Sequence, residues 1–385
     1  MSRFFFVRTV KLGKIFGIRI EIDYSWFLVF ALVFYSLGFE FYPQVYGFQL
    51  STSIWLGLFT TLLFFSSVLL HELAHSVVAN RNGVVIKKII LFIFGGVASL
   101  TQEPKKPGVE FRIAAAGPLT SIILGGLFFG LSLLVFPLSV TIGVALQYLG
   151  IINWSLAVFN LVPGYPLDGG RLLRAALWKK FGLERATTIA ARFGVGVGYL
   201  IVLYGIAQLI LFGNLLGLVW FGFIGFFLIS AARESVLQVL LMAALNKVRV
   251  RDLLSPNPVV VDATSSVRKL VEDIMLGLKQ QGSLVRAGNQ IVGTVDVERV
   301  RRLPVKDLGR VPVSRVMYHL KAGELLKTSL SAARALQIMA TDGSERLPVF
   351  ENGRLVGAVT RDDIRVYLAV KTDLLNRDHR GSHKI

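Results

Sequence analysis

Hydrophobic positions in this chain form long segments over residues 20–245 and short periodic ones beyond them. Several long segments contain the roughly 20 residues that a helix needs to cross the ~30 Å hydrocarbon core of a bilayer. We expect six spans, near residues 26–38, 51–80, 110–136, 140–162, 195–212 and 214–233. The pattern predicts a polytopic α-helical membrane domain with a small β-sheet, followed by an α+β module.

Two shorter segments favour strands over spans. Residues 8–22 alternate with period two and predict a hairpin at the membrane face. Residues 84–100 are apolar and β-branched, and Gly95 and Gly96 interrupt them, so we expect strand–turn–strand. The glycine pair is either the turn of a plain hairpin or a strand position where a second backbone approaches closely. In the second case a substrate peptide could pair with the strand by β-augmentation.

The net charge is +18, and the Lys and Arg residues of the predicted membrane domain lie in the segments expected on one side of the spans. The opposite loops, at 40–51, 136–140 and 212–215, contain no Lys or Arg. This is the positive-inside pattern, so both termini are expected in the cytoplasm and nucleic acid is not an expected partner. We expect a multi-pass protein of a prokaryotic cell membrane, in contact with the lipid bilayer.

Three ionisable side chains lie in the second span, where they are costly and usually functional. His71 and His75 are four residues apart, so on a helix they share one face. They can bind one zinc ion, and Glu72 beside them can act as a general base. A chance pair of helical histidines is the rival interpretation, and the cost of placing them in lipid disfavours it.

A third metal ligand has to be a carboxylate, because the chain has no cysteine and its other histidines lie after residue 300. Asp168 is the best candidate by elimination, since it lies in an apolar, proline-braced turn after the fourth span, whereas most other acidic residues of the membrane domain lie in polar loops or at span ends. Taken alone, Asp168 is a good N-cap for the next helix. The incomplete histidine pair favours the metal role.

Asn160 lies just before the same turn. Its amide could polarise a scissile carbonyl or hold an oxyanion. A hydrogen bond between helices is an equally good interpretation.

These motifs resemble the site-2 protease family of intramembrane zinc metalloproteases. The resemblance covers about residues 8–235 and depends on His-Glu-Leu-Ala-His at 71–75 and on the Asn-Leu-Val-Pro-Gly-Tyr-Pro-Leu-Asp-Gly-Gly segment at 160–170. It implies one zinc ion per chain held by His71, His75 and Asp168. It also implies that Glu72 activates water to cleave a transmembrane helix of a substrate protein. Asn160, Gly95 and Gly96 fall on the family's asparagine and on its substrate-presenting strand.

An internal repeat with a spacing of 64 residues follows the membrane domain. Residues 265–275 parallel 329–339, and 291–300 parallel 355–364, each unit reading helix–strand–strand–helix. This resembles a tandem pair of CBS domains. Such pairs often bind adenosine nucleotides, which implies Thr360 and Asp363 as contacts in the second repeat. A purely structural module, which forms a homodimer, is an equal alternative.

We therefore expect four regions: membrane protease domain 1–235, linker helix 236–247, CBS domains at about 248–309 and 310–370, and tail 371–385. The predicted activity is zinc-dependent intramembrane proteolysis, and the resemblance to CBS pairs implies that a nucleotide regulates it. A metal-ion transporter or channel with a CBS regulatory tail is the main rival, and a catalytically silent scaffold is the second. A transporter needs polar residues through several spans, whereas here they converge at one depth.

Overall fold

The computed structural model describes residues 9–93, 95–100, 104–255, 257–320 and 326–370. The expected tail 371–385 lies outside the described residues. The chain divides into two compact units, Met1–Val239 and Leu240–Ile385. The segment 236–247, expected as a separate linker helix, continues the last helix of the first unit as far as Asn246.

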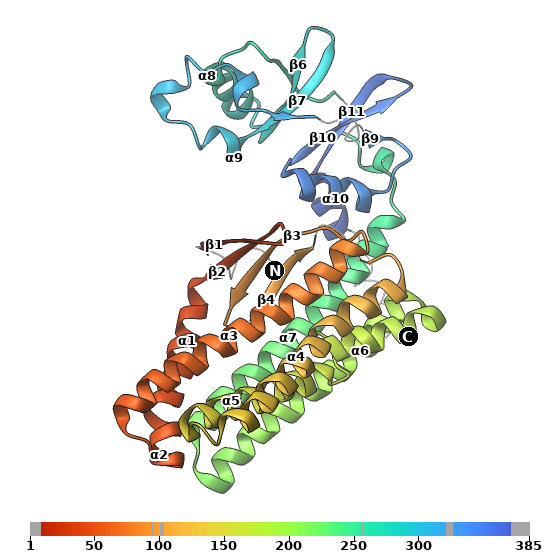
Figure 1. Cartoon of the computed structure of the whole chain (residues 1–385). Coiled ribbons are helices and arrows are strands. Elements are labelled where there is room, and N and C mark those ends of the chain that lie inside the picture. Colours follow the sequence, from red (N-terminus) through yellow and green to blue (C-terminus); the bar gives the residue numbers. More distant parts are fainter. Residues whose placement is uncertain (1–8, 94, 101–103, 256, 321–325, 371–385) are drawn as a thin grey trace. The chain divides into compact units, whose positions relative to one another are not determined.

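The first unit combines apolar helices with one small sheet (Figure 1). Its elements are β1 (Thr9–Ile15), β2 (Ile18–Asp23), α1 (Tyr24–Tyr35), the π-helix Ser36–Phe41, α2 (Tyr42–Tyr46), α3 (Leu50–Arg81), β3 (Ile86–Phe92), β4 (Gly95–Leu100), α4 (Pro107–Val135), α5 (Val140–Leu161), α6 (Asp168–Phe212) and α7 (Leu215–Asn246). Within the described residues, six helical segments are long and apolar enough to cross a membrane. The first of them runs from Tyr24 to Tyr46, which is longer than the predicted 26–38.

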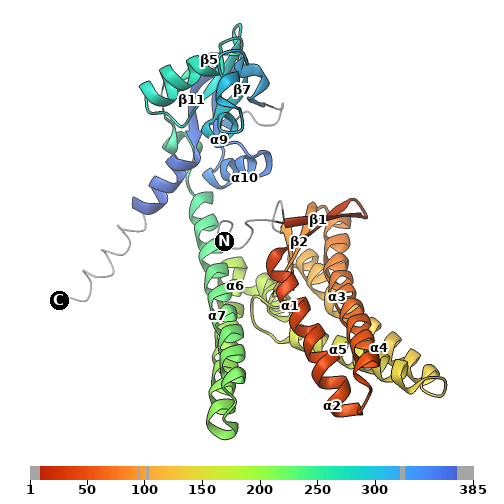
Figure 2. The same cartoon turned by 90° about the vertical axis from the view of Figure 1, so that its left-hand side faces the viewer.

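The strand order of the sheet is β1-β2-β3-β4, with β2 and β3 parallel and the outer pairs antiparallel. Helices α1 to α3 make the crossover between the two parallel strands, and α1 and α2 lie beside α3 (Figure 2). Gly95 and Gly96 pair with Phe92 and Leu91, so the two glycines begin β4 and do not form the turn. β4 is therefore an edge strand of the sheet.

A hydrophobic core joins this sheet to the half of α3 that carries the two histidines. Ile20 and Ile89 of the sheet, Leu73 of α3 and Ile113 of α4 are buried in one cluster. Packing of this kind fixes the rotation of α3 about its axis, because an interior has few voids and resists displacement. The sheet therefore stabilises the direction in which the two histidine side chains point.

Helix α6 consists of two helical segments joined at Gly182, whose backbone is left-handed with φ 77°. The second segment returns to the loop that precedes the helix: the backbone N–H of Tyr165 donates to the carbonyl oxygen of Ala190 over 3.0 Å. A Cβ on Gly194 would collide with the carbonyl oxygen of Tyr165. The loop at 162–167 is thus supported by a part of the chain some 25 residues later.

The second unit contains two repeats of one arrangement. Its elements are the 3-10 turn Val250–Leu253, β5 (Val260–Asp262), α8 (Val267–Lys269), the π-helix Leu270–Gly277, β6 (Gly282–Ala287), β7 (Gln290–Asp296), α9 (Val297–Val300), the 3-10 turns Val305–Asp307 and Val313–Arg315, β8 (Tyr318–His319), β9 (Leu326–Lys327), α10 (Ala332–Asp342), β10 (Arg346–Glu351), β11 (Arg354–Thr360) and helical residues 361–370. Each repeat also has a parallel strand, β5 or β9, that the predicted helix–strand–strand–helix pattern omits.

The 64-residue spacing of the repeats is exact in the strand registers. Gly282 pairs with Asp296 in the first repeat, and Arg346 pairs with Thr360 in the second. Each hairpin has a register shift at the equivalent place, after Val285 and after Val349. A bulge repeated at the same position shows that the two halves share one local geometry, as expected from the sequence repeat.

Candidate functional site

Three electron-rich atoms converge in the interior of the first unit. Nε2 of His71, Nε2 of His75 and Oδ2 of Asp168 form a triangle with edges of 3.2, 3.2 and 3.1 Å. All three residues are at most 8% exposed. In a tetrahedral site with each ligand about 2.0–2.1 Å from zinc, ligand atoms lie about 3.3 Å apart. The triangle therefore has the size and the nitrogen–oxygen composition of a zinc site.

The hydrogen bonds on the other side of the rings fix which nitrogen faces the triangle. Nδ1 of His75 lies 2.6 Å from the carbonyl oxygen of Ile113, which can only accept, so this nitrogen carries a proton. In the neutral imidazole Nε2 then has a free lone pair. This nitrogen lies 3.1 Å from a carboxylate oxygen and 3.2 Å from a second imidazole nitrogen, an arrangement that suits a shared cation. Nδ1 of His71 lies 2.8 Å from Oγ of Ser121, and this hydrogen bond orients the second ring.

One face of α4 supports both rings. Ile113, Gly117 and Ser121 are spaced by four residues each and therefore point to the same side of the helix. A Cβ on Gly117 would lie 2.6 Å from Cε1 of His75 and would also overlap Nε2 of both histidines. Sequence reasoning missed these contacts, although the small residues Gly117 and Ser121, four positions apart, were visible in the sequence.

Glu72 is half-buried and lies against the sheet. A Cβ on Gly96 would come within 2.6 Å of Cδ of Glu72, so the backbone of β4 passes directly over this carboxyl group. The structure thus brings together His71, Glu72, His75, Asp168 and Gly96. It places Gly95 one residue away, at the start of the same edge strand.

Asp168 is the first residue of α6, and Leu167 is the N-cap of that helix. Its carboxylate is directed at the histidines, and Nη1 of Arg171 lies 3.9 Å from its second oxygen. Asp168 is therefore not the N-cap of α6, contrary to the alternative interpretation of the sequence. Asn160 is half-buried at the end of α5, and its amide nitrogen donates to the carbonyl oxygen of Leu156 one turn earlier. One amide hydrogen of Asn160 remains for another acceptor.

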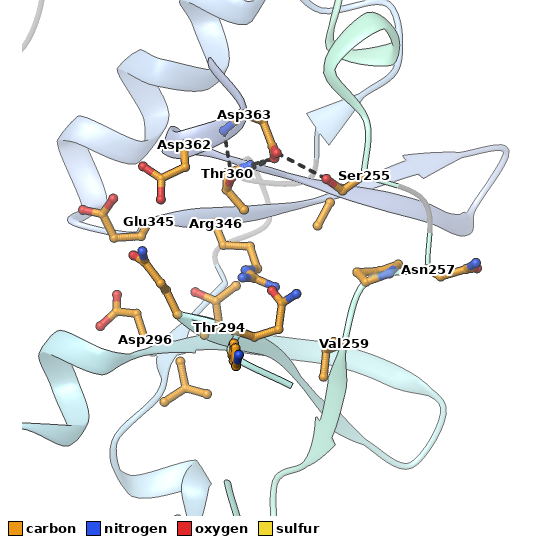
Figure 3. A pocket seen from close by; sticks show the side chains of 17 residues that line it. Ser255, Asn257, Val259, Thr294, Asp296, Glu345, Arg346, Thr360, Asp362 and Asp363 are labelled. Atoms are coloured by element: carbon orange, nitrogen blue, oxygen red, sulfur yellow. Dashed lines mark hydrogen bonds between the residues drawn. The ribbon is translucent and has the colours of Figure 1, made fainter. Parts of the chain in front are cut away.

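A separate cavity of about 380 Å³ lies between the two repeats of the second unit (Figure 3). The first repeat contributes Lys279, Thr294 and Asp296, and the second contributes Arg346, Thr360 and Asp363. Asp363 accepts hydrogen bonds from the backbone N–H and the hydroxyl of Thr360, both over 2.7 Å. The hydroxyl of Ser255 donates to its other oxygen over 3.3 Å. The two predicted nucleotide contacts therefore lie together on the wall of a cavity.

Burial changes the acid–base behaviour of two groups in this cavity. It raises the pKa of the Asp296 carboxyl, although the backbone N–H of Arg299 donates to this group and favours its charged form. It lowers the pKa of the Arg346 guanidinium, an effect that the negative charge of Asp363 opposes. A phosphate group in the cavity would neutralise Arg346 and would be repelled by Asp296.

Comparisons with known proteins agree with both units. The sequence profile of peptidase family M50 matches residues 59–144 and 138–203, and the CBS domain profile matches residues 325–370. The putative zinc metalloprotease sll0528 of Synechocystis sp. is 33% identical over 94% of this chain and 95% of its own length. The zinc metalloprotease MJ0392 of Methanocaldococcus jannaschii is 33% identical over 92% of this chain and 95% of its own length.

A further relative is the putative zinc metalloprotease Rip3 of Mycobacterium tuberculosis, 33% identical over 92% of this chain and 91% of its own length. Among solved structures, the site-2 protease from Methanocaldococcus jannaschii is 32% identical, with a TM-score of 0.43. It covers 60% of this chain and 95% of its own length. The matched profile regions contain both the histidine pair and Asp168.

Proposed function

Since this chain belongs to peptidase family M50, the site-2 proteases, and is a multi-pass membrane zinc metalloprotease, we propose that it cleaves transmembrane segments of membrane proteins within the bilayer. The observation that carries the proposal is the triangle of His71, His75 and Asp168. It is built on α3 and α6, two helices of membrane-spanning length. A nitrogen–oxygen site at that place is suited to hydrolysis of a peptide bond that the surrounding lipid protects from water.

Each residue of the site has a defined role in this proposal. Zinc held by His71, His75 and Asp168 would polarise the scissile carbonyl and lower the pKa of a water molecule to about 7. Glu72 accepts the proton of the attacking water and delivers it to the leaving nitrogen. Asn160 provides its remaining amide hydrogen for the developing oxyanion.

The edge strand β4 is the proposed substrate platform. A helical substrate has to unwind before attack, because its amides are hydrogen-bonded within the helix. An unwound segment regains those hydrogen bonds when it pairs with the edge of a sheet. Gly96 has no side chain, so the backbone of β4 at this position lies directly against Glu72. Pairing with β4 therefore places the substrate backbone beside the general base.

The test is reconstitution of the full-length protein in liposomes with a panel of single-span reporter proteins. We expect wild type to cleave a reporter within its hydrophobic segment, and a zinc chelator to stop cleavage. Glu72→Gln should retain one zinc per chain by elemental analysis and lose turnover by at least about 100-fold. Cleavage restricted to the soluble flanks of every reporter contradicts proteolysis inside the bilayer. Divalent-ion flux that depends on Glu72, without any cleavage, favours the transporter instead.

We further propose that an adenosine nucleotide binds the cavity of the second unit and regulates cleavage. All three proposed contacts line the cavity: Thr360 and Asp363 for ribose hydroxyls, and Arg346 for phosphate. The matched pair of variants is Arg346→Gln and Arg354→Gln, since Arg354 is exposed on β11 and does not line the cavity. Only the first should weaken binding of AMP and ATP, measured by calorimetry. Cleavage by a protein truncated after Lys247 should be insensitive to nucleotide, and a retained response rules out regulation through this module.

The basic loops support a cytoplasmic location of both termini. Accessibility of single cysteines added at either end, in a chain that has none, tests this orientation. Contact between second units of two chains would give a homodimer, which cross-linking of full-length protein in membranes can detect.

A further inference from the structure

Glu110 of α4 and Arg174 of α6 form an ion pair in the interior of the first unit. Glu110 is fully buried and Arg174 is 4% exposed. Nε of Arg174 donates to Oε1 of Glu110 over 2.8 Å, and Nη2 of Arg174 donates to the same oxygen. Desolvation of two charges offsets most of their attraction, so such a pair adds little net stability compared with apolar side chains. Stability alone is therefore a weak explanation for it.

Arg174 contacts the chain on the other side of the proposed ligand Asp168 as well. Its guanidinium carbon lies 5.0 Å from the centre of the Tyr165 ring, within the range of a cation–π contact. Tyr165 precedes Asp168 by three residues, and Arg174 follows it by six. The contact between Tyr165 and Arg174 therefore joins the chain segments before and after Asp168.

Glu110 extends the face of α4 that supports the two histidines. Glu110, Ile113, Gly117 and Ser121 are spaced by three, four and four residues, so they lie along one side of the helix. The last three contact the imidazoles of α3 through the hydrogen bonds and close approach described above. Helix α4 packs against both α3 and α6. It therefore connects the helix that carries the imidazoles with the helix that carries the carboxylate.

We propose that Glu110 and Arg174 are positioning residues that set the distance between the Asp168 carboxylate and the two imidazoles. The ion pair fixes α6 to α4, and α4 fixes the histidine rings, so the two edges of the triangle that end at Asp168 depend on this pair. This inference rests on the proposed zinc site. Groups that orient metal ligands without touching the metal typically change metal affinity or activity by about 10–100-fold when they are removed.

The experiment measures zinc in full-length protein purified in detergent, without any substrate. Apparent zinc affinity is obtained by competition with a chelating dye, and the visible spectrum of the Co²⁺-substituted protein reports the coordination geometry. The variants are Glu110→Gln, Arg174→Gln and the double variant. The matched controls are Arg112→Gln, an exposed arginine on the same turn of α4, and Glu184→Gln, an exposed glutamate on α6.

Each single variant should weaken zinc binding by about 10–100-fold and alter the Co²⁺ spectrum. The two controls should match wild type. The melting temperature of the zinc-free protein should fall in the single variants and recover in the double variant, because the double variant leaves no unpaired buried charge. Zinc affinity should remain low in the double variant, since the ion pair between α4 and α6 is still absent. This difference separates positioning from a purely structural role.

Wild-type zinc affinity and an unchanged Co²⁺ spectrum in folded Glu110→Gln overturn the inference, as does an equal loss in the two controls. If the charge-removing variants do not fold, Arg174→Lys and Tyr165→Leu take their place. Lysine keeps the charge but lacks the planar fork, and leucine removes only the ring. Both should show weakened zinc binding, and unchanged binding in both overturns the inference. A wild-type protein that binds no zinc instead contradicts the proposed function.

Discussion

The carbonyl oxygen of Ile113 accepts a hydrogen bond from Nδ1 of His75 over 2.6 Å. This carbonyl belongs to α4 and the histidine to α3. The backbone of α4 therefore fixes the tautomer of a histidine side chain on α3. A backbone acceptor cannot be removed by a side-chain substitution, so this contact is insensitive to the residue at 113. Gly117 and Ser121 on the same face of α4 can be substituted, so they can be tested directly.

Gly117→Ala should weaken zinc binding strongly. The added Cβ would lie 2.6 Å from Cε1 of His75 and overlap both Nε2 atoms, so the rings have to move apart. We expect a fall in zinc affinity of at least about 100-fold, measured by competition with a chelator. Alanine has a helix propensity about 1 kcal/mol better than glycine, so poorer helix formation cannot explain a loss. Gly126→Ala on the same helix has open space and is the control. Equal zinc affinity in the two variants contradicts the close approach.

Ser121→Ala should weaken zinc binding moderately. The serine hydroxyl lies 2.8 Å from Nδ1 of His71, and without it the ring loses the partner that fixes its orientation. We expect a decrease in zinc affinity of about 10-fold, at the lower end of the range for such groups, because the ring stays packed against α4. Ser132→Ala, in the same helix but bonded to the carbonyl oxygen of Phe129, should leave the affinity unchanged. A Ser121 variant that binds zinc as tightly as wild type would show that packing alone orients His71.

Gly96→Ala should separate zinc binding from turnover. The new methyl group would press on the carboxyl group of Glu72 and displace the backbone of β4, while the three proposed ligands keep their positions. We expect one zinc per chain by elemental analysis, with kcat reduced by at least about 100-fold in the reconstituted cleavage assay. Gly108→Ala, at an open position in the first turn of α4, is the control. Loss of zinc together with activity would mean that β4 supports the metal ligands themselves.

Asp296→Asn should stabilise the second unit at neutral pH. Burial raises the pKa of this carboxyl, so the folded state holds its proton more tightly than the unfolded state does. The stabilising effect of the protonated form is complete below about pH 4 and is lost as pH rises through the folded-state pKa. Asparagine has no charge to bury and still caps α9. Its advantage in melting temperature should therefore be largest at pH 7 and vanish near pH 4, as followed by scanning calorimetry of the full-length protein.

The same substitution should strengthen phosphate binding in the cavity, because it removes a negative charge from a lining that also contains Arg346. Asp262→Asn, on the exposed end of β5, is the control for a change of net charge. A melting-temperature difference that does not depend on pH would contradict the assigned effect of burial.

Much of the architecture was readable in the sequence, because each feature has a local cause. Length and hydropathy determine the spans, and the 64-residue repeat determines the two similar halves of the second unit. The three residues of the candidate metal site were also readable: the histidine spacing is local, and Asp168 was indicated because most other acidic residues of the membrane domain lie in polar loops or at span ends.

Other features depend on tertiary structure and have no local pattern. Ser121 and Glu110 are ordinary helix residues until the position of α4 against α3 and α6 is known. The choice between turn and strand for Gly95 and Gly96 depended on the register of β3 with β4. Sequence reasoning also left open whether Asn160 faces the chemistry, and its bond to Leu156 engages only part of the amide.

The two segments of α6 that meet at Gly182 have different structural roles. Its first segment begins with Asp168, and its second segment, through Ala190 and Gly194, supports the loop from which Asp168 emerges. A ligand that separated the two segments at Gly182 would remove this support. It would inhibit the enzyme without contacting the proposed metal ligands. Gly182 therefore marks a site for allosteric inhibition, where a ligand would compete with neither the substrate nor the metal.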